Sequence, residues 1–256
     1  MSGFEELLLS VDGSASQAVV QVGLDSLGLR EREHLQEWVI AHPSILGPGV
    51  RIITTEFDKW ESSEGTQVRD RLDVLGVGPD GRPVVVELKR GSAPATIHMQ
   101  ALNYAAMVSR LGVQDLAELL VEHAVRRGEV RQVEAALAEL ETQFLVTDDT
   151  IRNPRVVLIA GSFPASATAT VVWLNERGVD VTLIRFRAYI PVSGQNPLVS
   201  FSKLFPVPTV EEFTIGRSGL RPSEVFSDQP EDVPWDAEAI LRVTGRVLLS
   251  SVDELV

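Results

Sequence analysis

The chain has 256 residues, of which 44% are hydrophobic and 23% charged, an ordinary globular composition that excludes wholesale disorder and fibrous repeats. It has no cysteine, which excludes disulfides, thiol nucleophiles and thiolate zinc sites and fits a reducing compartment. With 23 basic and 36 acidic residues, its formal charge is −13. Such a protein is not a general electrostatic binder of nucleic acid or anionic membrane, so DNA binding needs a local basic patch or a bound metal ion.

Neither a secretion signal nor a membrane segment is expected. The first residues lack the basic region of a secretory signal, and we take residues 1–28 as an N-terminal extension. The uncharged stretch 156–175 is long enough to span a bilayer, but Gly161 and Pro164 divide it into a strand, a turn and a helix. We therefore expect a cytoplasmic protein.

Hydrophobic periodicity and turn residues predict the elements of the middle of the chain. In order, they are a helix over 29–42, strands over 50–57, 67–76 and 83–89, helices over 93–111, 113–127 and 129–143, a strand over 155–161, a helix ending at 178, and a strand over 179–190. The first helix stops before Pro43, because the residue before a proline disfavours the α conformation. A polar loop over 58–66 carries Trp60. This order predicts an α/β fold with a mixed β-sheet flanked by helices.

The last part of the chain differs in texture. Prolines recur through 191–256, which suggests an acidic, extended arm followed by a terminal helix over 236–249. An acidic arm can dock on a protein partner or mimic DNA. The terminal helix ends without a cap or turn residue, which would also suit a chain that continues into another domain.

Two other patterns carry no chemistry. The segment GVGPDG, residues 76–81, matches the dinucleotide-binding pattern, but it leads into a strand and so lacks the helix N-terminus that binds phosphate. We interpret it as a hairpin turn. The four histidines have no metal-ligand spacing, and we interpret each as a surface or capping residue: His34, His42, His98 and His123.

The densest chemical signal is RLDVLGVGPDGRPVVVELKR, residues 71–90. Strand alternation places Asp73 on one face with Arg71 and Leu75, with Leu72 and Val74 on the other face. In the following strand Val85, Glu87 and Lys89 share a face. Burying Glu87 and Lys89 in a strand of Val and Leu is costly unless they pair or bind something.

Across the hairpin, Asp73 can lie near Glu87. Two such carboxylates repel each other, and a divalent cation relieves the repulsion. Lys89 beside the cation can orient a water or offset charge on a phosphate, as metal-assisted phosphodiester hydrolysis requires. The structural alternative is that Glu87 and Lys89 are edge-strand charges and Asp73 is their solvated partner.

Two neighbouring helices offer further candidates. Gln100 and Tyr104 are four apart on the helix after the last hairpin strand, so they share a face and can reach the same site, although such residues are commonly ordinary helix positions. Glu31 leans toward the buried stripe of the first helix, whereas Glu33 and Glu37 project from the other side. Glu31 is either a third acid for the site or an N-terminal acid that stabilises the helix dipole.

Taken together, these motifs resemble the PD-(D/E)xK nuclease superfamily. Asp73, a hairpin and then Glu87-x-Lys89 form its core motif, and Gln100-x-x-x-Tyr104 is similar to its RecB-like branch. The segments EREHLQEWVIAHPSILG, ITTEF, RLDVLGV, VVVELKRG and QALNYAA look more closely like the NucS-type (DUF91-like) endonuclease group. The resemblance covers residues 27–112 well and the later strand–helix–strand more loosely, so the nuclease-like domain is set at 29–190.

The resemblance implies a restriction-endonuclease-like fold with an α-β-β-β-α-β core and a Mg²⁺- or Mn²⁺-dependent DNA nuclease active in repair, restriction or phage defence. It implies that Asp73 and Glu87 bind the metal, that Lys89 is catalytic, and that Glu31, Gln100 and Tyr104 complete the site. The chain departs from the superfamily in having Leu72 where a proline usually precedes the aspartate.

DNA is the expected partner. Arg69, Arg71, Lys89 and Arg90 are the local basic residues that can touch the DNA backbone, and Trp60 can stack on a base, although a loop tryptophan is commonly a packing anchor. A homodimer is possible, since enzymes that cut both strands are often two-fold dimers. The alternative function is a nuclease-fold scaffold, weakly active or inactive, that binds DNA or a protein; the −13 charge favours it, and the intact Asp73, Glu87 and Lys89 argue against it.

Overall fold

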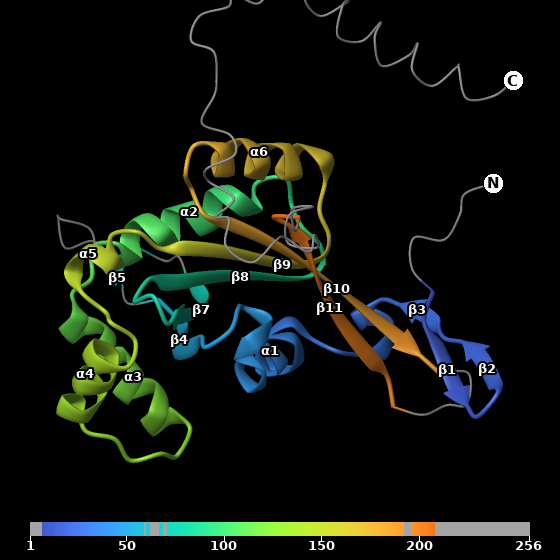
Figure 1. The fold of residues 1–256 in the computed structure, drawn as a ribbon, viewed down its shortest axis with the longest axis horizontal. Helices are drawn as coiled ribbons and strands as arrows, with labels where there is room; N and C mark the ends of the chain where they lie inside the picture. Colours follow the sequence, from blue (N-terminus) through green and yellow to red (C-terminus); the bar gives the residue numbers. More distant parts are fainter. Residues whose placement is uncertain (1–6, 59, 62–66, 69–70, 192–195, 208–256) are drawn as a thin grey trace, which may run out of the picture. The chain divides into compact units, whose positions relative to one another are not determined.

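The computed structural model describes residues 7–58, 60–61, 67–68, 71–191 and 196–207. These residues form a mixed sheet with helices on both faces (Figure 1). The strands are β1 (Leu9–Asp12), β2 (Ala15–Ala18), β3 (Val20–Val22), β4 (Arg51–Phe57), β5 (Trp60–Glu61), β6 (Gln67–Val68), β7 (Leu72–Val77), β8 (Pro83–Ser92), β9 (Arg155–Ser162), β10 (Val181–Ile190) and β11 (Leu198–Phe205).

The helices lie between the strands in the predicted order. They are α1 (Glu37–Ala41), α2 (Ile97–Val108), α3 (Val113–Arg126), α4 (Val133–Thr142), α5 (Asp148–Ile151) and α6 (Ala165–Glu176). A π-helical turn, Glu31–Gln36, runs directly into α1. No helix among the described residues is long and apolar enough to cross a membrane.

The main sheet has the order β11-β10-β9-β8-β7-β4, with β3 paired to the end of β10. The pairs β8–β9 and β9–β10 are parallel, and the other pairs are antiparallel. Parallel neighbours require crossover connections, which α2 to α5 and α6 supply. The predicted mixed sheet flanked by helices is therefore confirmed, and its elements follow the α-β-β-β-α-β order of a restriction-endonuclease-like core.

A separate hydrophobic core covers each face of this sheet. On one face, α2 and α6 cover the sheet (Figure 1), and Ile97, Val171 and the sheet residue Val85 belong to one hydrophobic core. On the other face, Leu35 and Val39 pack against the opposite side of the strands. A strand that is covered on both faces has no solvated side. Accordingly, every residue of β7 and of the first part of β8 is buried, and apart from Asp73 and Glu87 these residues are apolar.

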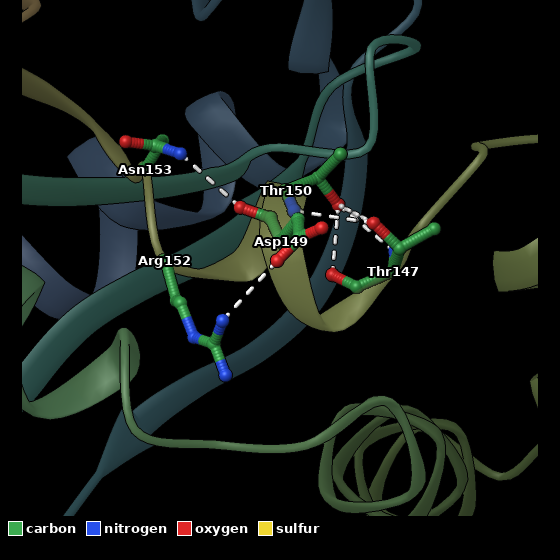
Figure 2. Close-up of polar contacts among 5 residues, drawn as sticks. All are labelled: Thr147, Asp149, Thr150, Arg152 and Asn153. Atoms are coloured by element: carbon green, nitrogen blue, oxygen red, sulfur yellow. Dashed lines mark hydrogen bonds and ion pairs between the residues drawn. The ribbon is translucent and has the colours of Figure 1, made fainter.

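The turn between β7 and β8 confirms the interpretation of GVGPDG. Gly81 has a φ of +76°, a conformation that favours glycine, and a Cβ there would collide with the Leu145 carbonyl before α5. Figure 2 shows how α5 begins: the Thr147 hydroxyl accepts from the Thr150 amide at 3.2 Å, and Thr150 Oγ1 accepts from the Thr147 amide at 2.9 Å. This capping box anchors the turn end of the hairpin.

Three expectations about individual residues were wrong. Leu72 packs with Leu75 in the core of α2 and α6, whereas Val74 packs on the opposite face, so the alternation breaks where β7 begins. Trp60 belongs to a short pair of strands, β5 and β6, within the segment expected to be a loop. The histidine at position 123 is buried, with 8% exposure. His34 is a capping residue as expected, since its Nδ1 accepts from the Arg30 amide at 3.0 Å.

The main sheet reaches beyond the segment in which we expected the nuclease-like domain. Strand β11 pairs along most of β10, and β3 from the expected N-terminal extension pairs with its end. The sheet thus takes in residues on both sides of the 29–190 segment, and the division of the chain stays a prediction. The expected terminal helix lies outside the described residues.

Candidate active site

Asp73 and Glu87 lie level with each other on neighbouring strands. Val74 of β7 is opposite Val86 of β8, and this antiparallel register sets Asp73 beside Glu87. Asp73 is 9% exposed and Glu87 is fully buried. The two carboxylates therefore lie close together, as the sequence predicted. Both are buried, so water does not screen the repulsion between their charges.

Lys89 lies beside the two carboxylates and forms an ion pair with Glu87. Its Nζ donates to Glu87 Oε1 at 2.5 Å and to the carbonyl of Leu88 at 2.9 Å. Burial lowers the pKa of Lys89, but the bond to Glu87 and the charges of the nearby carboxylates outweigh it and raise the pKa. Lys89 therefore stays a cation at neutral pH, facing two acids.

The second oxygen of Glu87 has no partner. Glu87 Oε2 is buried and has no hydrogen bond within the described part of the chain. Burial, together with the neighbouring Asp73 charge, raises the pKa of Glu87 to about 7 against the lowering effect of Lys89. A buried carboxylate oxygen without a partner is destabilising, so this atom needs a proton or a cation.

Asp73 is in a similar position. Its Oδ2 accepts from the Leu88 amide at 2.8 Å, which fixes the carboxylate across the gap between the two strands. Burial raises the pKa of Asp73 to about 6, against the opposing effects of that hydrogen bond and of Lys89. Near neutral pH the pair Asp73–Glu87 therefore shares its protons, and a divalent cation would replace them.

Glu31 joins the group from the first helical segment. It is the first residue of the π-helical turn, and its Oε2 accepts from the Arg90 amide at 2.6 Å. Its charge raises the pKa of Asp73 and of Glu87, so it lies within electrostatic range of both. Glu33 pairs with Arg30 on the outer side, as the spacing predicted.

A further carboxylate at this end of the sheet, Glu56, had not been singled out from the sequence. Thr55 is opposite Val74 and Phe57 is opposite Leu72, so the register sets Glu56 level with Asp73 on the other side. Its signal was present in the segment ITTEF, where an acid ends a strand of β-branched residues. Burial raises the pKa of Glu56, Arg32 lowers it, and the charges of Asp73 and Glu31 raise it.

The other predicted residues lie at varying distance from this group. Gln100 Nε2 donates to the Tyr104 hydroxyl at 3.0 Å, and Tyr104 is buried in the core, so the two share a helix face as predicted. Arg90 is half-exposed and pairs with Asp25 at 2.8 Å. Trp60 lies in β5. Arg69 lies outside the described residues. Their roles at the site stay predictions.

The donor set suits a hard divalent cation in kind. Carboxylate oxygens are the ligands that Mg²⁺ and Mn²⁺ prefer, and Mg²⁺ is commonly held by only one or two carboxylates together with water and substrate phosphates. Within the described residues, no three acids or histidines converge closely enough to hold a metal by themselves. Asp73 and Glu87, with the partnerless Oε2, therefore fit a cation that shares its coordination with substrate.

No protein-family model and no curated protein matches the chain. Three solved structures are similar to it: an EndoMS–dsDNA complex, with 20% identity and a TM-score of 0.29; a repair endonuclease from Pyrococcus abyssi, with 19% and 0.30; and EndoMS in apo form, with 19% and 0.28. The alignments cover 60%, 59% and 59% of this chain, and 44%, 46% and 45% of those chains, so it spans less than half their length. Likenesses this weak assign no function, which has to be argued from the site.

Proposed function

We propose that the chain is a Mg²⁺- or Mn²⁺-dependent nuclease that hydrolyses phosphodiester bonds in DNA. The observation that carries this proposal is the buried Glu87 beside Asp73 and Lys89, whose Oε2 has no hydrogen-bond partner among the residues that the structure describes. A fold that needed these residues only for stability would gain from replacing them with apolar ones, since buried ionic groups rarely stabilise. DNA repair, restriction or phage defence are the settings in which we expect such an activity.

Each residue has a part in this chemistry. Asp73 and Glu87 would hold the metal ion, which when bound polarises the phosphate and lowers the pKa of a water. Lys89, held as a cation by Glu87 and the Leu88 carbonyl, offsets the negative charge that grows on the phosphate. Glu31 lies where it can orient the attacking water or add charge to the metal site. Gln100 and Tyr104 would support the site from α2.

Calorimetric titration with Mn²⁺ tests the metal site directly. We expect the wild type to bind Mn²⁺, and Asp73→Asn and Glu87→Gln to lose binding while keeping the fold by circular dichroism. Asp149→Asn, which removes an equal charge from an exposed ion pair on α5, is the matched control and should bind like the wild type. Because the pKa values of Asp73 and Glu87 lie near 6 and 7, binding at pH 6.5 should release about one proton, measurable in buffers of different ionisation enthalpy.

Cleavage of duplex, flapped and single-stranded DNA in Mn²⁺ then separates an enzyme from a scaffold. Cleavage that is lost in both acidic variants and kept in Asp149→Asn supports the nuclease. Mn²⁺ and DNA binding without cleavage of any substrate would favour the alternative, a nuclease-fold scaffold. A wild type that binds no Mn²⁺, even with a short duplex present, would contradict the proposed metal site.

A further inference from the structure

Two arginines converge on a single carboxylate oxygen beside the candidate site. Arg32 Nε lies 3.1 Å and Arg71 Nε 2.9 Å from the same Oε2 of Glu56. The two arginines are 39 residues apart in the chain: Arg32 lies in the π-helical turn, and Arg71 directly precedes β7. Two positive charges therefore share one negative charge, and the trio keeps one unit of positive charge next to the acids of the site.

Glu56 is held in this position at a cost. Its φ is +54°, in the left-handed region that side chains with a Cβ seldom adopt, and its Oε1 is buried without a hydrogen-bond partner in the described part of the chain. A strained backbone and an unpaired buried oxygen both lower stability. Such strained residues persist only where the surrounding structure holds them in place, and they are concentrated at functional sites.

The surface next to Arg32 is hollowed. A depression of about 340 Å³ is lined by Arg30, Glu31, Arg32, Glu33 and Arg90. Three of its five residues are basic, in a protein with a formal charge of −13. Glu31 lines this depression, and its charge raises the pKa of Asp73, so the depression lies beside the candidate site.

We propose that Arg32 and Arg71 form a clamp for DNA phosphates beside the scissile one, and that Glu56 is the positioning residue that holds both guanidinium groups in place. This inference rests on the proposed nuclease function and adds Arg32 and Glu56 to its machinery. A guanidinium group presents several N–H donors in one plane, which suits bidentate contact with phosphate oxygens. The clamp would supply the local basic patch that an acidic protein needs for DNA.

The arrangement also explains why one carboxylate serves two arginines. If each guanidinium had its own carboxylate, an entering phosphate would have to displace a complete ion pair. With one oxygen shared, the guanidinium groups are oriented but not neutralised. An incoming phosphate can then accept hydrogen bonds from guanidinium N–H groups that do not contact Glu56.

Salt-dependent binding to a labelled duplex, with Ca²⁺ in place of Mg²⁺ to suppress cleavage, tests the clamp. Each phosphate contact contributes about 0.9 to the slope of log K against log salt concentration. Arg32→Gln and Arg71→Gln should each reduce that slope by about 1. Arg152→Gln, which removes a similar charge from the exposed pair on α5, is the matched control and should leave the slope unchanged.

Glu56→Gln separates positioning from a merely structural role. The variant removes one negative charge, so duplex affinity should be no weaker and KM no higher than in the wild type, while kcat falls by about tenfold because the arginines lose their fixed orientation. Unchanged kcat and KM in a folded Glu56→Gln variant would assign Glu56 a structural role only and overturn that part of the proposal.

The remaining outcomes distinguish the clamp from the nuclease proposal. If the wild type binds Mn²⁺ and cuts DNA but Arg32→Gln and Arg71→Gln behave like Arg152→Gln, the clamp is wrong and the nuclease proposal stands. If the wild type binds neither Mn²⁺ nor duplex, both proposals fall. Reduced slopes in both arginine variants, with Mn²⁺ affinity unchanged, support the clamp independently of the metal ligands.

Discussion

The two ends of the β7–β8 hairpin are built from the same pair of strands but differ in how the carboxylates beside them are paired. At the turn end, Arg82 pairs with Asp180 at 3.0 Å and donates to the Asn153 carbonyl at 2.7 Å. The five residues drawn around α5 all take part in polar contacts (Figure 2). At the other end Glu87 and Glu56 each keep a buried oxygen that has no hydrogen-bond partner within the described ranges of the chain.

Under the proposed function, this difference separates a turn end that stabilises the fold from a site end that binds a metal ion. Buried polar groups in folded proteins are almost always paired, so those that are not require an explanation. At the turn end the polar groups of Arg82, Asp180 and α5 are paired locally, although the buried Nε of Arg155, opposite Val84, has no hydrogen-bond partner in the described part of the chain. At the site end the carboxylates are level with one another, which destabilises a sheet unless a cation or a proton enters.

The largest effect is expected from Lys89→Met, which removes the cation at the site end of the hairpin. Cleavage should fall by about 100-fold or more, because the variant removes the cation that offsets charge on the phosphate. Lys89 lowers the pKa of Glu87, so its loss raises that pKa and moves Mn²⁺ binding to higher pH. Cleavage rates and Mn²⁺ titrations across a pH series would check both. Unaltered cleavage would remove Lys89 from the mechanism.

Gly81→Ala breaks the turn end instead. The φ of +76° and the collision with the Leu145 carbonyl should lower the free energy of unfolding by about 2–4 kcal/mol. Thermal and urea unfolding measure this loss. Below the melting temperature, Mn²⁺ affinity should match the wild type, since the proposed metal ligands, Asp73 and Glu87, lie at the far end of the strands. A parallel loss of Mn²⁺ affinity in the folded variant would show that the two ends are coupled.

Both ends of the hairpin follow from local sequence patterns, and these were predictable. Leu35, Val85 and Ile97 followed ordinary periodicity, and the helices and strands appear in the predicted order. Asp73, Glu87 and Lys89 converge because a hairpin with a known turn fixes its own register. Local pattern is enough where contacts are local.

Glu56 shows where prediction from sequence stops. Its place beside Asp73 depends on the pairing of β4 with β7, two strands separated by a connection whose length gives no register. A bulge between Ile52 and Thr54 shifts that register, and no residue type announces it. The positive φ of Glu56 is equally invisible in the sequence, since glycine is the residue expected there.

Asp73→Asn should stabilise the protein while it abolishes Mn²⁺ binding. Asparagine still accepts from the Leu88 amide but carries no charge. Because the folded pKa of about 6 lies above the ordinary value of 3.8, ionising Asp73 costs stability; the cost is absent below about pH 4, grows as pH rises to about 6 and stays constant above. We expect a gain of about 1–3 kcal/mol at pH 8 that vanishes near pH 4. Urea unfolding at the two pH values measures it, and an equal gain at both would rule out the charge as its cause.

The smallest effect is expected at the cap of α5, where the polar groups are already satisfied. Thr147→Ala removes the hydroxyl that accepts from the Thr150 amide and should cost about 1 kcal/mol of unfolding free energy at any pH between 5 and 8. Arg152→Ala, which breaks an exposed ion pair with Asp149, should change it by less than about 0.5 kcal/mol. Thr147→Ala should lower the unfolding free energy equally at each pH, whereas Asp73→Asn should raise it only at higher pH. This contrast would distinguish a hydrogen bond that stabilises the fold from a charge that the proposed metal ion requires. A loss at Thr147 that varied with pH would mean that α5 also responds to the carboxylates, and the contrast between the two ends would not hold.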